Sequence, residues 1–332
     1  MTSPKATHRT GFEPGYRRLL ASGELQRRIA RLEAMLECCD LCPRRCQVDR
    51  RRELGRCFTG VEPIVASWGP HMGEEPPLSG SRGSGTLFLA NCNLRCAFCQ
   101  NADISQRPSD HIGHTSGVAE LAAAMLQLQA DGRHNINWVS PTHQVPALVR
   151  ALALAAENDL SLPIVYNSNG YDAIAVLELL DGVVDIYMPD LKYSDAVTAQ
   201  ELSGIADYPS AARSAVAEMF RQVGDSWDIG PGGTLHRGLL VRVLVLPGDL
   251  AGVAETLRWL SEALSPLVAV SLMSQYRPCH RAGRVAAHPE LRRTVNREEH
   301  LAALAALKRF NQSPHTLVQG FVGLQGEGRA RP

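Results

Sequence analysis

The sequence predicts an α/β protein built on a parallel sheet, and two observations support this. From residue 85 onward, short apolar runs rich in β-branched and aromatic residues alternate with segments of helical pattern. Six such strand–helix units follow one another, which implies parallel strands joined by right-handed crossovers and covered by helices. Six units are too few for a closed eight-unit barrel. An open, partial barrel and a doubly wound sheet both fit, and both place the active site at the carboxyl ends of the strands.

The predicted elements follow one another at short intervals. Strands are expected at residues 86–90, 136–139, 164–166, 183–187, 239–246 and 267–272. Helices are expected at residues 118–131, 145–157, 172–181, 210–223, 250–264 and 298–310. Ser116 is a typical capping residue for the first of these helices, and Asp172 is one for the third.

A small N-terminal module is expected before the sheet. Aliphatic residues recur at helical spacing and predict an amphipathic helix through Leu25, Ile29, Leu32 and Leu36. A basic, cysteine-rich segment follows at 38–57, and the stretch 69–85, rich in Gly, Pro and Ser, is expected to be a loop. We therefore divide the chain into an N-terminal extension, a core, and a C-terminal helix and tail, at residues 1–80, 81–290 and 291–332.

Composition and charge limit the expected partners. The 332 residues are 45% hydrophobic, which is enough to bury one large core. Lys plus Arg and Asp plus Glu both number 34, so no net field attracts nucleic acid or an anionic membrane. Residues 1–15 lack the apolar run of a secretory signal, and no stretch approaches the roughly 20 apolar residues of a membrane span. We therefore expect a cytoplasmic protein without a nucleic-acid or membrane partner.

Nine cysteines in a cytoplasmic chain favour metal ligation or catalysis, because thiols stay reduced in that compartment. Cys92, Cys96 and Cys99 directly follow the first predicted strand with the spacing C-x3-C-x2-C. A loop there can turn three thiolates toward one point, and soft thiolates select an iron–sulfur cluster or zinc. Three ligands are one short for a four-iron cluster, which leaves one iron open to a substrate or cofactor. The alternatives are a zinc knuckle or three unrelated buried cysteines.

The run Cys92-Asn-Leu-Arg-Cys96-Ala-Phe-Cys99-Gln-Asn resembles the radical S-adenosylmethionine (SAM) superfamily. C-x3-C-x-F-C after a strand is that family's signature, and the run is similar to the branch containing pyruvate formate-lyase activating enzyme. The resemblance covers roughly residues 69–272. It implies a partial (β/α)6 barrel and a 4Fe-4S cluster on the three cysteines, whose open iron binds SAM. Reductive cleavage would then give methionine and a 5′-deoxyadenosyl radical that takes hydrogen from a substrate.

The resemblance extends to later strand ends and implies SAM contacts there. Asn169 lies in Asn-Ser-Asn-Gly, which is similar to the family's Thr-Asn-Gly. Asp190 and Lys192 lie in Asp-Leu-Lys, which matches the family, and Lys192 could pair with the SAM carboxylate. Arg242 lies in a stretch similar to the family's Val-Arg-x-x-Val-x-Pro-Gly. The alternative is a solvated pair of Asp190 and Lys192 and an Arg242 that faces water.

One motif departs from the family. After the second strand the family usually has Gly-Gly-Glu-Pro, whereas this chain has Ser140-Pro-Thr-His-Gln144, which leaves the substrate open. The variant resembles an activating-enzyme-related subgroup. Polar residues that could line its substrate cavity are His71, Glu74, Glu75, His143, Gln275 and Tyr276.

A second cysteine group lies upstream, spaced Cys39-x2-Cys42-x3-Cys46-x10-Cys57. Four thiolates can complete the coordination of zinc or of a second iron–sulfur cluster, and the spacing does not choose between them. An auxiliary cluster could relay electrons or bind substrate in a SAM-cleaving enzyme, which slightly favours iron. Cysteines without a metal are the alternative, and Cys38 is expected to be a spare thiol. The arginines of this segment would offset a negative metal centre, bind an acidic partner, or form a solvated basic face.

We therefore expect a radical SAM oxidoreductase with an electron donor such as a flavodoxin or ferredoxin. The substrate could be a protein or peptide, as in a glycyl-radical enzyme activase, or a small molecule. No catalytic side chain is assigned; Cys279 could present a thiol in the cavity or be simply buried. The alternative is a non-catalytic iron–sulfur or zinc protein with a structural or redox-sensing role.

Overall fold

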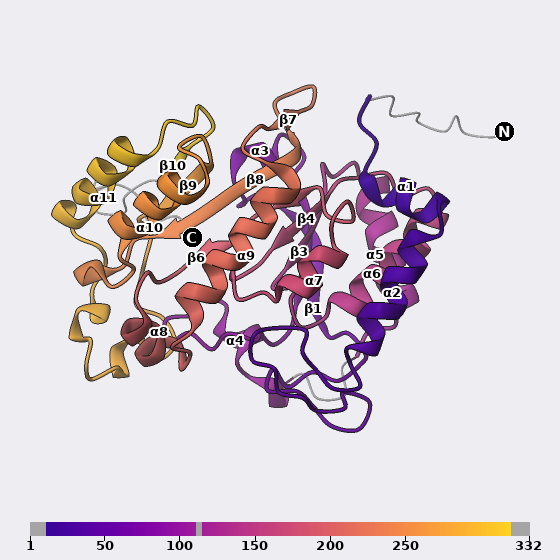
Figure 1. Ribbon diagram of the computed structural model, residues 1–332, viewed down its shortest axis with the longest axis horizontal. Helices are drawn as coiled ribbons and strands as arrows, with labels where there is room; N and C mark the ends of the chain where they lie inside the picture. Colours follow the sequence, from indigo (N-terminus) through magenta and orange to yellow (C-terminus); the bar gives the residue numbers. More distant parts are fainter. Residues whose placement is uncertain (1–10, 111–114, 320–332) are drawn as a thin grey trace, which may run out of the picture.

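The computed structural model describes residues 11–110 and 115–319 (Figure 1). The first ten residues and the end of the expected C-terminal tail lie outside the described residues. Ten strands of the described chain form one sheet in the order β1-β2-β3-β4-β5-β8-β9-β10, and β6 and β7 also pair with β8. Neighbouring strands are parallel except at β1/β2 and β7/β8. The predicted α/β fold with a mostly parallel sheet is therefore confirmed.

The strands are β1 (Val65–His71), β2 (Ser84–Leu89), β3 (Ile136–Val139), β4 (Ile164–Asn167), β5 (Ile186–Tyr187), β6 (Asp190–Leu191), β7 (Asp228–Ile229), β8 (Leu235–Leu244), β9 (Ala269–Met273) and β10 (Leu317–Gln319). The helices are α1 (Gly15–Ala21), α2 (Glu24–Ala34), α3 (Pro76–Ser79), α4 (Ala102–Ser105), α5 (Val118–Ala130), α6 (Val145–Glu157), α7 (Ile174–Leu179), α8 (Ala196–Ser203), α9 (Tyr208–Val223), α10 (Val253–Trp259) and α11 (Arg297–Phe310). A π-helical turn, Leu260–Leu264, extends α10, and short 3-10 turns lie at Pro108–Asp110, Pro247–Asp249, Ala282–Arg284 and Pro289–Arg292.

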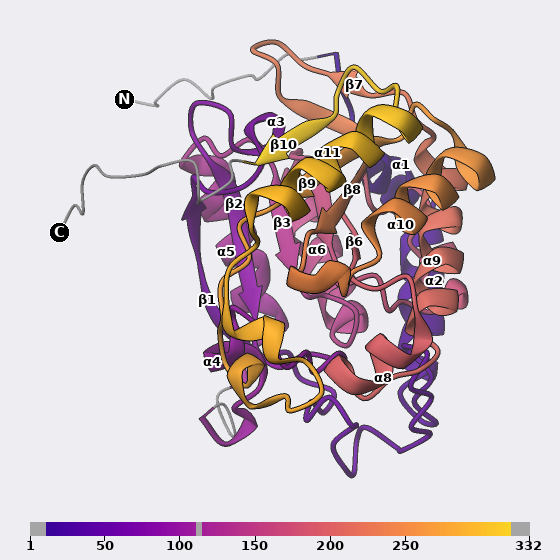
Figure 2. The same ribbon diagram turned by 90° about the vertical axis from the view of Figure 1, so that its left-hand side faces the viewer.

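The long helices lie along the outside of the sheet, with α5, α6, α9, α10 and α11 around it (Figures 1 and 2). Strands covered in this way are buried and apolar, which explains the continuous apolar runs in the sequence. Trp138, Tyr166 and Tyr187 are register neighbours on β3, β4 and β5, and they belong to the large core beneath the helices. The helices α1 and α2 add to this core by packing on α6.

The opposite, inner face of the sheet has an apolar part and a polar part. Leu78 of α3 packs there against the buried Val165, Ile186, Leu240 and Ala269. Polar side chains follow on the same face, at alternating positions toward the carboxyl ends of the strands: Asn137, Asn167, Arg242 and Ser271. In addition, Gln319 of β10 donates to the Glu75 carboxylate beyond β1 at 3.3 Å, so the two ends of the sheet are in contact. This arrangement is compatible with a partial barrel.

The structure differs from the sequence prediction at several boundaries. Residues 69–71 form the end of β1 rather than a loop, and β1 and β10 extend the sheet beyond the expected core at 81–290. Gly117, not Ser116, caps α5, and the Glu120 side chain accepts from its backbone N–H. Asp172 does not cap α7; its buried carboxylate accepts hydrogen bonds from hydroxyl groups.

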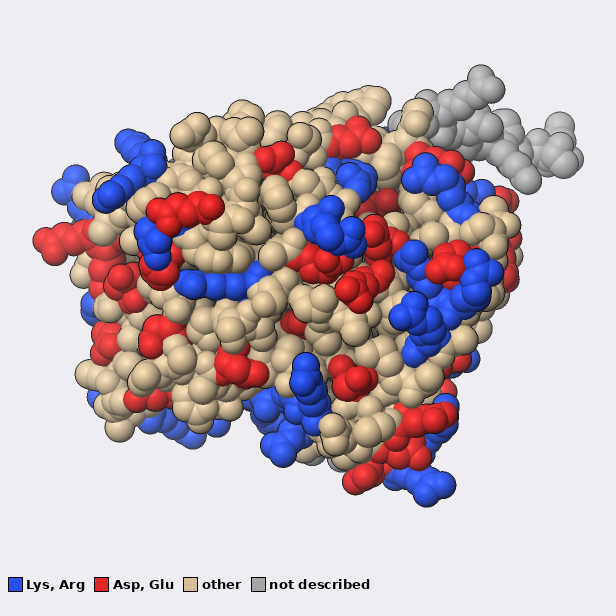
Figure 3. Space-filling model, in the orientation of Figure 1, with Lys and Arg blue, Asp and Glu red and all other residues tan. Residues whose placement is uncertain are grey.

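Basic and acidic side chains are interspersed over the face shown in Figure 3, in line with their equal numbers in the sequence. Among the described helices, none combines the length and the apolar character needed to cross a membrane.

Candidate functional site

A cavity of about 250 Å³ lies at the carboxyl ends of the strands. All seven residues predicted as cluster ligands or SAM contacts in the core contribute to its lining, although they come from four separate segments of the chain: Cys92, Cys96, Cys99, Asn169, Asp190, Lys192 and Arg242. Parallel strands end at the same edge of a sheet, which is why residues so far apart in sequence meet here. The structure thus brings the predicted site together in one place.

The three cysteines lie on the loop that follows β2. Cys92 is held by its sulfur, which accepts from the Leu94 N–H at 3.4 Å and from the Asn169 side-chain amide at 3.2 Å. The Cys99 sulfur lies 3.2 Å from the Ser105 hydroxyl. Burial raises the pKa of Cys92 to about 12 and also raises that of Cys96. These thiols are therefore protonated unless a metal or another cation stabilises their thiolates.

No described group of three or more His, Cys, Asp or Glu side chains is arranged to hold a single metal ion. The cysteine loop nevertheless offers three soft sulfur donors to one cavity. By its chemistry, this donor set suits an iron–sulfur cluster or zinc.

Asp190 is the centre of a buried ion-pair network. Its carboxylate lies 2.6 Å from Lys192 Nζ and 2.7 Å from Arg242 Nε, and these two residues are 16% and 17% exposed. Burial opposes the charge on Asp190, but Arg242 and Lys192 together outweigh it and hold the pKa of the carboxyl below its usual range. Burial also opposes the charge on Lys192, but Asp190 outweighs it, so the Lys192 pKa is raised. The low exposure excludes the solvated pair considered from the sequence.

Arg242 connects this network to the inner face of the sheet. Its Nη2 donates to the Asn167 side-chain oxygen at 2.6 Å, and its Nη1 lies 3.8 Å from Glu74. Register pairing of Asp190 with Arg242 on β6 and β8 holds the two charges side by side. Two of its five N–H donors are bonded to side-chain oxygens of Asp190 and Asn167, so Arg242 holds Asp190 in place while its guanidinium still lines the cavity.

The loop after β4 connects the network to the cysteines. The Asn169 amide donates to Cys92 Sγ and, at 2.7 Å, to the Asn93 side-chain oxygen. The hydroxyl of Tyr208, on α9, lies within hydrogen-bonding distance of the Asn169 carbonyl, the Asp190 carbonyl and the Lys192 N–H. Tyr208 was not predicted from the sequence, because it lies before the helix expected at 210–223 and no local pattern shows that its side chain reaches a strand end.

The other polar candidates from the sequence take different places. Only Gln275 lines the cavity. Tyr276 donates to the Leu291 carbonyl, and Glu75 is bound to Gln319. His143 is buried, with Nε2 3.0 Å from the Ala90 carbonyl, and burial lowers its pKa to about 4.

His71 packs edge-on against Phe88, and Glu74 accepts from Asn137 within the inner face. Cys279 is not among the cavity-lining residues. Residues that the sequence analysis missed also line the cavity, namely Leu94, Phe98, Gln100, Asn101, Ser105, Val139, Ser140, Asn167, Ser168, Leu244 and Met273. Six of these are the last residue of a strand or directly follow one, namely Val139, Ser140, Asn167, Ser168, Leu244 and Met273, so the rule that strand ends line the site could have found them.

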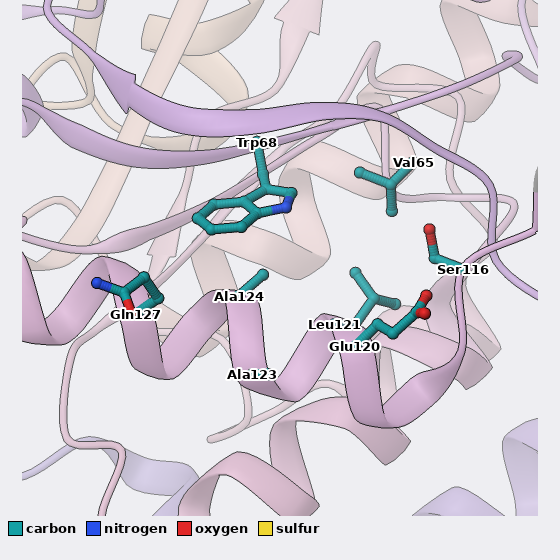
Figure 4. Close-up of a pocket in the computed structure, with 8 residues that line it drawn as sticks. All are labelled: Val65, Trp68, Ser116, Glu120, Leu121, Ala123, Ala124 and Gln127. Carbon is teal, nitrogen blue, oxygen red and sulfur yellow. The ribbon is translucent and has the colours of Figure 1, made fainter.

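A larger hollow of about 430 Å³ lies between β1 and α5, away from the cysteines. Figure 4 shows Trp68 above Leu121 and Ala124 of the helix, with Glu120 at the side. Its lining is mainly apolar and contains one carboxylate and no cysteine, histidine or basic residue. The smaller cavity is therefore the better candidate for chemistry, because it gathers the ionisable and metal-binding groups.

Among the upstream cysteines, Cys39, Cys42 and Cys57 are buried, Cys46 is half-buried and Cys38 is exposed. All nine cysteines are free of disulfides.

Comparison with known proteins adds one relative. No family model matches the chain. It is similar to an uncharacterized protein of Methanocaldococcus jannaschii, with 29% identity over 282 residues, covering 82% of this chain and 75% of that protein.

Proposed function

We propose that this chain is a radical SAM enzyme that binds a 4Fe-4S cluster through Cys92, Cys96 and Cys99. The observation that carries the proposal is the shared cavity: three thiols and a buried basic network meet at the carboxyl ends of the strands. Three features support a partial (β/α)6 barrel as the fold type: the sheet order, the packing of Leu78 on apolar side chains of the inner face, and the polar side chains on the rest of that face. When bound and reduced, the cluster would supply the electron that cleaves SAM.

The residues of the cavity suit the polar groups of SAM. Lys192 is a charged ammonium held at the cavity by Asp190, and an ammonium is a suitable partner for a carboxylate. Asn169 fixes one cysteine and the loop beside it, so it would hold the cluster and the cofactor in a defined relation. Burial of the network keeps water away from these contacts, which strengthens them.

The substrate side of the cavity is less specific. Gln275, Asn101 and Ser105 line it with neutral polar groups, and Ser140 occupies the place where the resembling family has a glycine-rich motif. These residues fit a glycine backbone of a partner enzyme or a small neutral molecule. An electron donor such as a flavodoxin or a ferredoxin completes the proposed reaction.

The decisive experiment measures SAM cleavage. Anaerobically reconstituted protein, reduced with dithionite, should convert SAM to 5′-deoxyadenosine, and Cys96→Ala should abolish the product. Cys279→Ala is the matched control and should retain activity, because Cys279 does not line the cavity. If the wild type carries an intact cluster and makes no 5′-deoxyadenosine, the proposal is wrong. A stability loss in Cys96→Ala without any effect of SAM would instead favour a structural metal.

A further inference from the structure

The upstream cysteines form a second cluster of sulfur atoms within irregular backbone. Cys39, Cys42 and Cys57 are 3%, 8% and 6% exposed, although no regular helix or strand surrounds them. The chain folds back on itself here: the Cys39 N–H donates to the Val48 carbonyl, and the Gln47 N–H donates to the Cys39 carbonyl, both at 2.9 Å. The segment has no regular secondary structure of its own, and it packs through Cys39 and Leu41 into the main hydrophobic core.

Gly55 indicates how closely the sulfurs approach one another. A Cβ added at Gly55 would lie 3.2 Å from Cys57 Sγ and 3.6 Å from Cys46 Sγ. Two sulfur atoms from positions eleven residues apart in the sequence therefore lie against the same glycine. The absence of a side chain at Gly55 leaves room for them.

Arg50 supplies the independent observation. It is 3% exposed, and its guanidinium donates to the carbonyls of Gly60 and His143 and lies 3.6 Å from the Cys39 sulfur. Within the described chain, no carboxylate forms an ion pair with it. A buried cation without an anion is costly. The sulfur atoms are the groups beside Arg50 that can become negative.

We propose that Cys39, Cys42, Cys46 and Cys57 bind a thiophilic metal centre, zinc or an iron–sulfur cluster, whose negative charge is balanced by the buried Arg50. The four sulfur atoms are not gathered around one point in this structure, so metal binding would draw them together. Four thiolates complete the coordination of such a centre. Such a centre would explain why a guanidinium without a carboxylate partner is buried next to these cysteines. Cys38 takes no part, because its side chain is exposed.

The second centre lies next to the cavity. Asn93 lies in the loop between Cys92 and Cys96, and its side-chain oxygen accepts from Asn169. Arg44 also donates to the Asn93 carbonyl. Loss of the second metal would therefore disturb the loop that carries the proposed SAM-cleaving cluster, and this consequence alone rests on the proposed function.

Metal analysis of anaerobically purified protein tests the site. Wild type should contain either one zinc or more iron and sulfide than one four-iron cluster accounts for. Cys42→Ser should lose this zinc or this additional iron and sulfide. Cys38→Ser is the matched control and should keep the wild-type content. Cobalt titration gives a second readout, because a tetrathiolate site produces sulfur-to-cobalt charge-transfer bands that Cys42→Ser should lack.

The outcomes separate the two proposals. Cys96→Ala should lose iron from the cavity and keep the metal at Cys39, Cys42, Cys46 and Cys57. If wild type shows no zinc, no additional iron and no cobalt–thiolate bands, the second centre does not exist, whether or not SAM is cleaved. If the second metal is present and SAM is not cleaved, only the proposed function fails.

The role of Arg50 has its own test. Arg50→Gln should release the second metal to a chelator about tenfold faster or more, roughly the effect of removing one hydrogen bond to a charged group. Arg51→Gln is the matched control, because Arg51 is exposed and pairs with Glu37 at 2.8 Å. Equal release rates in the two variants would overturn the proposed charge balance.

Discussion

The side-chain amide of Asn169 lies 3.2 Å from the sulfur of Cys92, although 77 residues separate them in the sequence. The contact joins the loop after β4 to the loop after β2, across the edge where the parallel strands end. The same amide reaches the side chain of Asn93, and the Asn169 side-chain oxygen accepts from the Tyr171 N–H at 2.9 Å. Asn169 therefore fixes the orientation of one proposed cluster ligand.

Replacing Asn169 should weaken SAM cleavage without removing the cluster. Asn169→Ala leaves buried partners of its amide unsatisfied, which costs about 1–3 kcal/mol and corresponds to roughly tenfold to hundredfold in kcat/KM. The measurement is the rate of 5′-deoxyadenosine formation against SAM concentration, with iron content as a check on the cluster. Asn158→Ala serves as the control, because its exposed side-chain amide donates to the Leu154 carbonyl and, among the described residues, to nothing else. Equal kinetics for both variants would show that Asn169 does not position the site.

Removing Asp190 should destabilise the fold as well as the site. Asp190→Ala leaves Lys192 and Arg242 buried together without their shared carboxylate, and breaking a buried pair costs about 3–5 kcal/mol. Urea unfolding of wild type and variant measures the difference. Asp195→Ala is the comparison, because Asp195 is an exposed cap of α8 and its loss should cost only about 1 kcal/mol. Similar losses in both variants would mean that the Asp190 network contributes little to stability.

The sequence predicts most of the core and the cavity. Residues 145–157 were expected as a helix and are α6, because its apolar pattern is continuous. The residues around the cavity could be placed together because parallel strands share one carboxyl edge, so Cys92 and Asn169 meet without any signal that names the contact.

The features that were missed lack a local signal. The strand β1 contains Gly69 and Pro70, which indicate a loop, yet an edge strand tolerates a proline because one side of it needs no ladder hydrogen bond. Asp172 resembles a helix cap, but its hydroxyl partners come from three places: Thr142, Tyr166 and Ser168. Only the folded chain brings these groups together.

A methyl group at Gly170 should push the loop that carries Asn169 away from Asp190, and both residues belong to the proposed SAM site. Gly170 has φ +80°, and an added Cβ would overlap the carbonyl oxygen of Asp190. Gly204→Ala is a matched control, because Gly204 has φ +69° and no atom within 4 Å of an added Cβ. The left-handed backbone alone should cost each variant about 1–2 kcal/mol. Gly170→Ala should lose more stability in urea and also SAM cleavage, and equal behaviour of the two would contradict the close packing.

The pH dependence of the free energy of unfolding should reveal the titration of the Asp185 carboxyl group. Its carboxylate accepts from the N–H groups of Ile164 and Gly15, but burial outweighs these bonds and raises the pKa of Asp185 to about 7. Between about pH 4 and pH 7 an unfolded aspartate is ionised while the folded one keeps its proton. The folded state then binds more protons, so its free energy of unfolding falls as pH rises through this window. Asp185 makes its full contribution to the free energy of unfolding below about pH 4.

Asp185→Asn removes the titrating group, so the free energy of unfolding of the variant should no longer fall for this reason as pH rises. Compared at pH 4 and pH 8, the stability advantage of wild type over the variant should shrink by about 4 kcal/mol or less. Asp195→Asn provides a control of opposite sign, because hydrogen bonds from Thr198 and Val197 lower the Asp195 pKa, so its contribution is lost as pH falls. Urea unfolding at several pH values measures both. If wild type and Asp185→Asn keep a constant difference from pH 4 to pH 8, Asp185 is ionised in the folded protein, and its two backbone contacts rather than burial determine its charge.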